Sequence, residues 1–307
     1  MSLFSIQQDN DAEAFSLDGA HAALCVLASG SRGNCSVLVI PKTESSPRRV
    51  YLIDAGLSPR RTASLLAERG IRPDEVDAII YTHLDSDHCF GGWVRAIRPG
   101  YFTPKLMIHR GHMGRAERMG LLSVPAEPFD DEFELSTNVQ LFTEVLAHDS
   151  LGVACFRFVI QGLSSTEAHL GYATDCGRVT PGLINHMQGV DTLAIESNYC
   201  PQMQEDSGRP AFLKKRIMGG SGHLSNQLSA HAVQRIKPRN HLVLLHLSQE
   251  CNTPQTAQAE HTHDGLIQTI STQHAATSWI PIHPAPQESQ VRFPPRKAKQ
   301  ASLFGGS

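Results

Sequence analysis

The stretch His83-Leu84-Asp85-Ser86-Asp87-His88 follows directly on the apolar run at residues 78–81. It places four imidazole or carboxylate side chains within six positions, and these are the groups that most often bind divalent metals in proteins. A short apolar run of this kind is typical of a buried strand, so we expect the stretch to be the loop at the strand's C-terminal end, where α/β proteins tend to place their chemistry. The alternative, a solvated acidic turn beside a chance histidine, leaves the two flanking histidines unexplained. The stretch therefore predicts a metal site.

Three further candidate ligands each follow the end of a strand-like apolar run. They are His148, Asp175 and His246. Because the ends of neighbouring strands can meet at one edge of a sheet, we expect these side chains to lie close to residues 83–88. Together the two sets supply what a site for two metal ions needs.

The order and spacing of these side chains resemble the ligand pattern of the metallo-β-lactamase superfamily, which is His-x-His-x-Asp-His, then a His, a bridging Asp and a last His. The resemblance implies an α/β fold, a four-layered αββα sandwich, with two bound divalent metal ions. By position it assigns one ion to His83, Asp85 and His148, the other to Asp87, His88 and His246, and the bridging role to Asp175. Asp85 stands where the superfamily usually has a histidine. Because a carboxylate hardens the site, Mn²⁺ is favoured, with Zn²⁺ or Fe²⁺ as alternatives.

Five shorter segments narrow the resemblance. They are Ser29-Gly30-Ser31-Arg32-Gly33-Asn34, Leu52-Ile53-Asp54-Ala55-Gly56-Leu57-Ser58, Glu196-Ser197-Asn198-Tyr199, Gly222-His223-Leu224-Ser225-Asn226 and His246-Leu247-Ser248-Gln249-Glu250-Cys251-Asn252. With the ligand motif, and in this order, they resemble the YycJ (WalJ) type of metallo-β-lactamase-fold nuclease. That resemblance implies a bacterial 5′ exonuclease acting on double-stranded DNA.

The candidate catalytic residues are Asp87, Asp175 and His223. By resemblance, His223 would contact the scissile phosphate or protonate the leaving oxygen. Asp54 and Asp149 are expected to fix ligand histidines. For Asp54, a turn cap after its strand is an equal alternative.

Candidate substrate-binding residues lie in three segments. The glycine turn at residues 29–34 offers backbone donors that suit an anion or a bend. The basic run at residues 214–216 closely precedes His223, so it is expected to grip a strand that enters the site. The expected helix start after His223 favours a phosphate. The predicted substrate-binding residues are Ser31, Asn34, Lys215, Arg216 and Asn226.

Composition fits a cytoplasmic enzyme. A net charge of −3 is not that of a protein that coats DNA by charge alone, so any contact with DNA must be local. The seven cysteines include no Cys-x-x-Cys pair and are expected to be reduced and buried, with Cys89 and Cys176 assigned to packing rather than to metal binding. The first residues lack a basic stretch followed by a long apolar one, which argues against a secretory signal, and we expect no association with a membrane.

Strands and helices are expected to alternate within one catalytic domain at residues 21–282, which follows an N-terminal extension at residues 1–20. Helices are predicted at residues 59–70, 113–119, 181–187, 224–236 and 255–270. Strands are predicted at residues 50–53, 105–108, 151–160 and 192–196 and in the runs that carry the ligands. Ser58 and Pro59 fit the N-cap and first position of the first helix.

The segment at residues 283–307 is rich in proline and polar groups and then basic, which predicts a flexible, disordered tail. Within it, Gln300-Ala301-Ser302-Leu303-Phe304 resembles the bacterial sliding-clamp-binding pentapeptide Gln-Leu-Ser/Asp-Leu-Phe, with Ala301 departing from the pattern. The resemblance implies that Gln300, Leu303 and Phe304 bind the clamp. The alternative is a tail that docks on its own domain.

The function predicted from the sequence is that of a metal-dependent phosphodiesterase, a 5′ exonuclease in DNA replication or repair that is tethered to the sliding clamp. RNA is the alternative polymer. A small-molecule hydrolase of the same fold, such as a cyclic phosphodiesterase, thioesterase or lactonase, would share every ligand. A non-catalytic clamp-bound adaptor would instead predict weak metal binding.

Overall fold

A computed structural model describes residues 19–44, 46–148, 150–162 and 166–285, and two seven-stranded sheets account for its centre. The first sheet has the order β14-β1-β2-β3-β4-β5-β6 and the second the order β13-β12-β11-β10-β9-β8-β7. The strands of the first sheet are β1 (Ala22–Ala28), β2 (Cys35–Ile40), β3 (Arg49–Ile53), β4 (Ala78–Ile80), β5 (Lys105–His109), β6 (Ala126–Phe129) and β14 (Ile280–Ile282). Those of the second are β7 (Glu132–Ser136), β8 (Val139–Leu146), β9 (Val153–Gln161), β10 (Glu167–Ala173), β11 (Thr192–Glu196), β12 (His241–Leu245) and β13 (Ile267–Ile270).

The two sheets share one pairing pattern. From β14 to β3 the first sheet pairs antiparallel, and from β3 to β6 it pairs parallel. The second sheet pairs antiparallel from β7 to β10 and parallel from β10 to β13. The two halves of the domain are therefore built alike, although no internal repeat is visible in the sequence.

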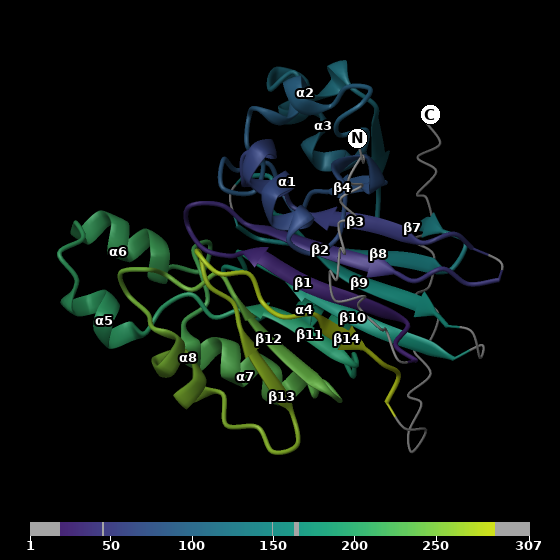
Figure 1. Cartoon of the computed structure of the whole chain (residues 1–307). Coiled ribbons are helices and arrows are strands. Elements are labelled where there is room, and N and C mark those ends of the chain that lie inside the picture. Colours follow the sequence, from purple (N-terminus) through teal and green to yellow (C-terminus); the bar gives the residue numbers. More distant parts are fainter. Residues whose placement is uncertain (1–18, 45, 149, 163–165, 286–307) are drawn as a thin grey trace, which may run out of the picture.

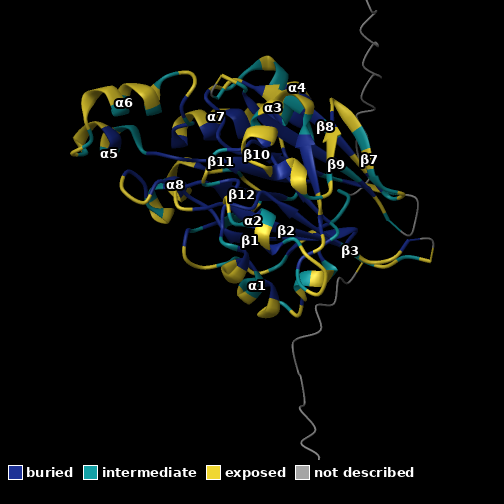
Figure 2. Ribbon diagram, turned by 90° about the horizontal axis from the view of Figure 1, so that it is seen from above, coloured by how far each residue is buried: buried dark blue, intermediate teal, exposed yellow. Residues whose placement is uncertain are grey.

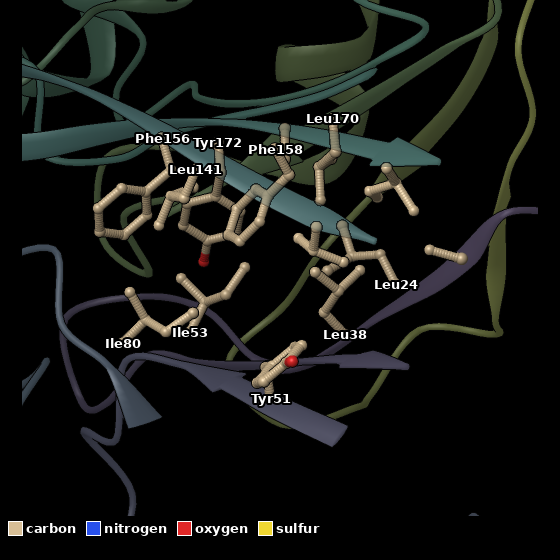
Figure 3. Close-up of a cluster of buried hydrophobic side chains, with 14 of the residues drawn as sticks. Leu24, Leu38, Tyr51, Ile53, Ile80, Leu141, Phe156, Phe158, Leu170 and Tyr172 are labelled. Carbon is tan, nitrogen blue, oxygen red and sulfur yellow. The ribbon is translucent and has the colours of Figure 1, made fainter. Parts of the chain in front are cut away.

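The main core lies between the sheets. Leu24, Leu38 and Ile53 from the first sheet face Phe156 and Leu170 from the second, and all of them are fully buried (Figure 3). The strands that carry these residues appear in the sequence as near-continuous apolar runs, because most of their residues are buried whichever face of the sheet they occupy.

Helices cover the outer faces of both sheets (Figure 1). The helices are α1 (Pro59–Ala67), α2 (Trp93–Ala96), α3 (Met113–Arg118), α4 (Pro181–Met187), α5 (Pro201–Asp206), α6 (Ala211–Met218), α7 (Asn226–Ile236) and α8 (Pro254–Glu260). Leu66 of α1 and Trp93 of α2 pack on the first sheet, whereas Leu183 of α4 and Val233 of α7 pack on the second. Seen from above, the buried strands lie between helices whose outward faces are exposed (Figure 2). The predicted αββα sandwich is confirmed.

Local sequence explains where several elements begin. The Ser58 hydroxyl accepts a hydrogen bond from Arg61 N, with Pro59 at the first position of α1, as predicted. The Ser225 hydroxyl caps α7 in the same way by accepting from Leu228 N.

One predicted helix is wrong. The segment at residues 255–270 contains α8, which ends at Glu260, and then the strand β13, which pairs in parallel with β12. The backbone leaves the helix at His261, which has φ −97° and ψ 57°, and Gly265 in the turn before β13 has φ +80°, a left-handed conformation that suits glycine. The β-branched ends of Ile267–Ile270 then favour the sheet.

The seven cysteines are free thiols, six of them buried. In the part of the chain that the structure describes, no helix has the length and apolar character needed to cross a membrane. Asp149, most of the predicted N-terminal extension and the tail with Gln300, Leu303 and Phe304 lie outside the described residues.

Candidate metal centre

The candidate ligands gather where strands β3, β4, β8, β10 and β12 end. Three of the residues there have left-handed backbones, with φ of 60° at Asp54, 52° at Asp175 and 55° at His246. A residue other than glycine in this conformation costs on the order of 1–3 kcal/mol, and such residues concentrate at functional sites. Of the described residues, only one more non-glycine residue has a positive φ, Lys237 at the end of α7. The fold therefore maintains unfavourable backbone at this one edge.

Backbone hydrogen bonds fix the loop at residues 83–88. Asn34 N donates to Asp87 O at 2.7 Å, and Ala55 N donates to His88 O at 2.8 Å. A side chain on Gly56 would overlap the carbonyl oxygen of Asp87, so this close approach requires glycine. The glycine-containing turns after β1 and β3 thus brace the loop that carries four of the candidate ligands.

Six of the seven predicted ligands converge in two groups that share Asp175. His83 and His148 form one group with Asp175, and Asp87, His88 and His246 form the other with it. Within each group the ligand atoms lie within 4.8 Å of one another. The sequence resemblance assigned these six residues to the same two groups and added Asp85 to the first.

Asp175 lies at the centre of both groups. Its Oδ2 is 3.6 Å from the Nε2 atoms of both His83 and His148, and 3.3 Å from Nε2 of His88. Its Oδ1 contacts Nδ1 of His246. Metal–ligand bonds of roughly 2.0–2.2 Å place neighbouring ligands on one ion about 3–3.5 Å apart, so the spacing suits shared coordination.

Asp85 lies beside the first group without being one of its members. Its Oδ2 is 3.8 Å from Nε2 of both His83 and His148. Its other oxygen, Oδ1, pairs with Nη2 of Arg115 from α3 at 2.7 Å. Both of these side chains are 28% exposed. The sequence showed Arg115 only as one member of a basic segment, and nothing local marked it as the partner of Asp85.

Asp54 orders the two adjacent histidines. Its Oδ2 accepts from Nδ1 of His88 at 2.7 Å, and its carboxylate also accepts from the Thr82 hydroxyl at 2.9 and 3.0 Å. The Thr82 oxygen in turn lies 3.0 Å from Nδ1 of His83. Both imidazoles are therefore held through Nδ1 and turn Nε2 towards Asp175. Because Asp54 also accepts from Thr82 N at 2.8 Å, it caps its turn as well.

The residues present fit a divalent cation. Nε2 of His83 is buried and has no hydrogen-bond partner. A buried polar atom without a partner costs about 1–3 kcal/mol, which a metal bond would offset. Burial also lowers the pKa of His83 well below its ordinary value, and the neutral imidazole is the form that binds metal.

A histidine–carboxylate pair adjoins the two groups. Nδ1 of His223 lies 2.6 Å from Oε1 of Glu196, and the His223 ring centroid lies 5.2 Å from that of His246. Oε2 of Glu196 accepts from the backbone N of Cys176 at 2.8 Å and of Leu224 at 3.2 Å. Glu196 can group geometrically with His223, Asp175 and His246, but these hydrogen bonds already occupy both of its oxygens. It therefore orients His223.

The charge around His223 favours its protonated form. Burial alone would lower the pKa of His223, but the carboxylates of Glu196, Asp175 and Asp87 outweigh burial and raise the pKa to about 9. Sequence analysis did not identify the role of Glu196. The available signal was an acidic residue at the end of the apolar run 192–196.

A cleft of about 600 Å³ opens beside His223. Ser31, Arg209 and Arg216 line it, together with Leu213 of α6. Of the predicted substrate-binding residues, Ser31 and Arg216 therefore face this cleft. Lys215 is exposed on α6 but does not line it.

The predictions for Asn34 and Asn226 are corrected. Both side chains are buried and engaged within the fold. The Asn34 amide accepts from Gly30 N at 2.8 Å and lies 3.0 Å from Nε2 of His88. The Asn226 amide accepts from the Ser197 hydroxyl at 2.7 Å. These asparagines satisfy buried loop backbone and side chains, which is a common use of short amides, and they do not face the cleft.

Comparisons with known proteins agree with this geometry. The family described as Beta-lactamase superfamily domain matches residues 49–247. Exodeoxyribonuclease WalJ of Streptococcus pneumoniae is 30% identical over 239 residues, which cover 76% of this chain and 84% of that protein. Exodeoxyribonuclease YycJ of Bacillus anthracis is 27% identical over 245 residues, covering 76% and 85%. The crystal structure of the metallo-beta-lactamase fold protein YhfI from Bacillus subtilis superposes with a TM-score of 0.60 at 13% identity, covering 84% and 99%, and supports the fold alone.

Proposed function

The chain belongs to the metallo-β-lactamase superfamily and is a metal-dependent hydrolase of the phosphodiesterase and nuclease type, and on this premise we propose that it is a DNA exonuclease that degrades strands from the 5′ end. One observation carries the proposal, the sharing of Asp175 between two groups of ligand atoms beside the His223–Glu196 pair. The relatives named as exodeoxyribonucleases support DNA as the substrate.

We assign one divalent cation to His83, Asp85 and His148, the other to Asp87, His88 and His246, and the bridging position to Asp175. When bound, the cations would supply Lewis-acid activation of water and of the phosphodiester. Mn²⁺ is proposed because Asp85 contributes a hard oxygen, and Zn²⁺ and Fe²⁺ are the alternatives.

The chain's own groups account for the remaining chemistry. Glu196 accepts from Nδ1 of His223, so the Nε2 proton of this histidine is held on the opposite side of the ring. With a pKa raised to about 9, His223 carries that proton at neutral pH and can donate it to the oxygen that leaves from phosphorus. Arg216, on the wall of the cleft, is placed to bind a flanking phosphate.

The decisive assay is digestion of DNA labelled at one end. We expect the purified chain with Mn²⁺ to shorten duplex DNA from its 5′ ends and Asp87→Ala to abolish the cleavage. Parallel arms with single-stranded DNA and RNA test the choice of polymer. Hydrolysis of bis(p-nitrophenyl) phosphate without cleavage of any polymer would refute a nuclease and leave a small-molecule phosphodiesterase.

We further propose that Gln300-Ala301-Ser302-Leu303-Phe304 recruits the enzyme to the bacterial sliding clamp in replication or repair. The support is the sequence resemblance, in which Leu303 and Phe304 would enter the clamp's apolar pocket and Gln300 would bond at its rim. Tethering by a short flexible linker raises effective concentrations to the millimolar range. A labelled peptide covering residues 295–307 should bind clamp in fluorescence polarisation, and the same peptide with Leu303→Ala and Phe304→Ala should not. Equal behaviour of the two peptides would remove this part of the proposal.

A further inference from the structure

Helix α6 presents an aromatic side chain to solvent. Phe212 is 75% exposed, more than any other large hydrophobic side chain in the described residues. In Figures 1 and 2, α5 and α6 project together from one end of the sandwich, and most of α6 is exposed. Single exposed apolar residues are common, so the exposure of Phe212 indicates a binding surface only if the neighbouring residues also suit a ligand.

The surroundings of Phe212 include the candidate cleft. Residues four apart on a helix lie in one row, so Phe212 and Arg216 are neighbours on the surface of α6. Arg216 lines the cleft, as do Leu213 and Ile217 from the adjacent row. Phe212 is not part of the cleft lining, but on α6 it lies next to these residues, and the same cleft reaches His223.

The α6 side of the rim is basic, and Glu250 in the cleft lining is paired with Arg209 at 2.8 Å. The sequence of α6 carries Lys214, Lys215 and Arg216 and no acidic side chain. Lys215 and Arg216 are exposed, and Lys214 is held against the backbone by a bond of 2.5 Å from its Nζ to Glu205 O. Because the whole chain has a net charge of −3, this basic run is a local feature and not part of a general positive surface. A polyanion is the partner that such a rim suits.

We propose that the rim of α6 is a stacking platform for the DNA strand that enters the cleft. Phe212 stacks on an unpaired base near the strand end, and Lys215 and Arg216 bind the phosphates on either side of it. Proteins that hold single strands commonly combine an aromatic face with a basic track, since every base has a π-face. The inference deepens the proposed nuclease function and rests on it. It identifies the substrate as a strand with unpaired nucleotides at the end being digested.

The test measures binding to full-length protein in EDTA, where no strand is cut. The probes are a single-stranded oligonucleotide and a blunt duplex, each labelled for fluorescence anisotropy. Phe212→Ala should bind the single strand about 5- to 100-fold more weakly, the range for removing one base–aromatic stack. Phe212→Leu, which keeps an apolar side chain, should lose as much, and Phe212→Trp should restore binding. Ile267→Ala removes another exposed apolar side chain, 65% exposed on β13, and serves as the matched control without effect.

A spectroscopic readout separates stacking from a structural role. A 2-aminopurine near the 5′ end of the single strand should lose fluorescence on binding to the wild type and retain it with Phe212→Leu. If Phe212→Ala and Phe212→Leu both bind the single strand as tightly as the wild type, or if 2-aminopurine stays unquenched in the wild-type complex, the stacking platform is overturned while the nuclease remains intact. Failure of the wild type both to bind and to cut any oligonucleotide would instead refute the nuclease function on which the platform rests.

Discussion

The pairing of Asp85 with Arg115 leads to a prediction about the metal that the first site accepts. Asp85 offers Oδ2 to the His83–His148 group and gives Oδ1 to Arg115 at 2.7 Å. A histidine at position 85 would present a borderline nitrogen ligand in place of a hard oxygen. We expect Asp85→His to shift the metal preference from Mn²⁺ towards Zn²⁺, but only if the positive charge of Arg115 is also removed.

The reason is the positive charge of Arg115, which remains when the Asp85 carboxylate is removed. Without the Asp85 carboxylate, the Arg115 guanidinium would lose this negative partner and would still lie near a dication. At roughly 6 Å and an effective dielectric constant of about 40–80, a single charge and a double charge repel by about 1.5–3 kcal/mol, which is about 10- to 100-fold in affinity. Asp85→His alone should therefore bind any divalent ion weakly at this site. Adding Arg115→Gln should recover that affinity, now with Zn²⁺ preferred.

The assay is metal content per chain by elemental analysis, together with competition against a chelating indicator for Mn²⁺ and Zn²⁺. A full cycle of wild type, two single variants and the double variant isolates the coupling. Arg110 supplies the matched control, since it pairs with Asp130 at 2.8 Å far out in solvent, with side chains 63% and 56% exposed. Arg110→Gln should not rescue Asp85→His. If the double variant binds no better than Asp85→His, charge compensation by Arg115 is refuted, and if Zn²⁺ gives the wild type its highest rate, the argument from ligand hardness fails.

Four further predictions concern the other polar groups of the site. Asp175→Ala should lose at least one of two bound ions by elemental analysis, and retention of both would contradict the bridging role. Asp54→Asn should weaken metal binding by about 10- to 100-fold, because a carboxylate that fixes a ligand histidine typically contributes this much; unchanged affinity in a chelator titration would leave Asp54 a turn cap only. His223→Ala should lower turnover by about 10²–10⁴-fold with unchanged metal content, whereas loss of metal would make His223 a ligand. Glu196→Gln removes the charge that raises the pKa of His223, so the alkaline limb of the rate profile should move to lower pH, and an unmoved limb would exclude His223 as the acid.

The clustering of the candidate ligands could be predicted from the sequence because these residues follow the ends of apolar runs. Residues 83–88 follow β4, and Asp175 and His246 follow β10 and β12, which belong to the parallel half of the second sheet. A parallel strand is buried on both faces, so its end is sharply marked in the sequence. Strand ends of this kind meet at one edge, which is why separate motifs predicted a common site.

The supporting residues could not be predicted, because their partners are distant in sequence. Arg115 resembles any other member of a basic segment until α3 places it against Asp85. Glu196 ends a strand as many acidic residues do, and its bond to His223 depends on how α7 is set against β11. The error at Asn34 has a related cause. A polar residue in a glycine turn can face outward to a ligand or inward to loop backbone, and only the packed structure decides.

The electrostatics of the centre explain why the fold maintains it at some cost to stability. Burial alone would lower the pKa of His88, yet Asp175 and Asp54 outweigh burial and raise it well above its ordinary value, so a proton on His88 neutralises part of the buried negative charge. Divalent cations at the same position would replace that proton, because metal ligation requires neutral imidazole. The left-handed backbones at Asp54, Asp175 and His246 hold these groups close together although each conformation is unfavourable. Apolar packing would stabilise the fold at least as well as such a cluster, so the chemistry of these groups, and not stability, explains their concentration at one edge.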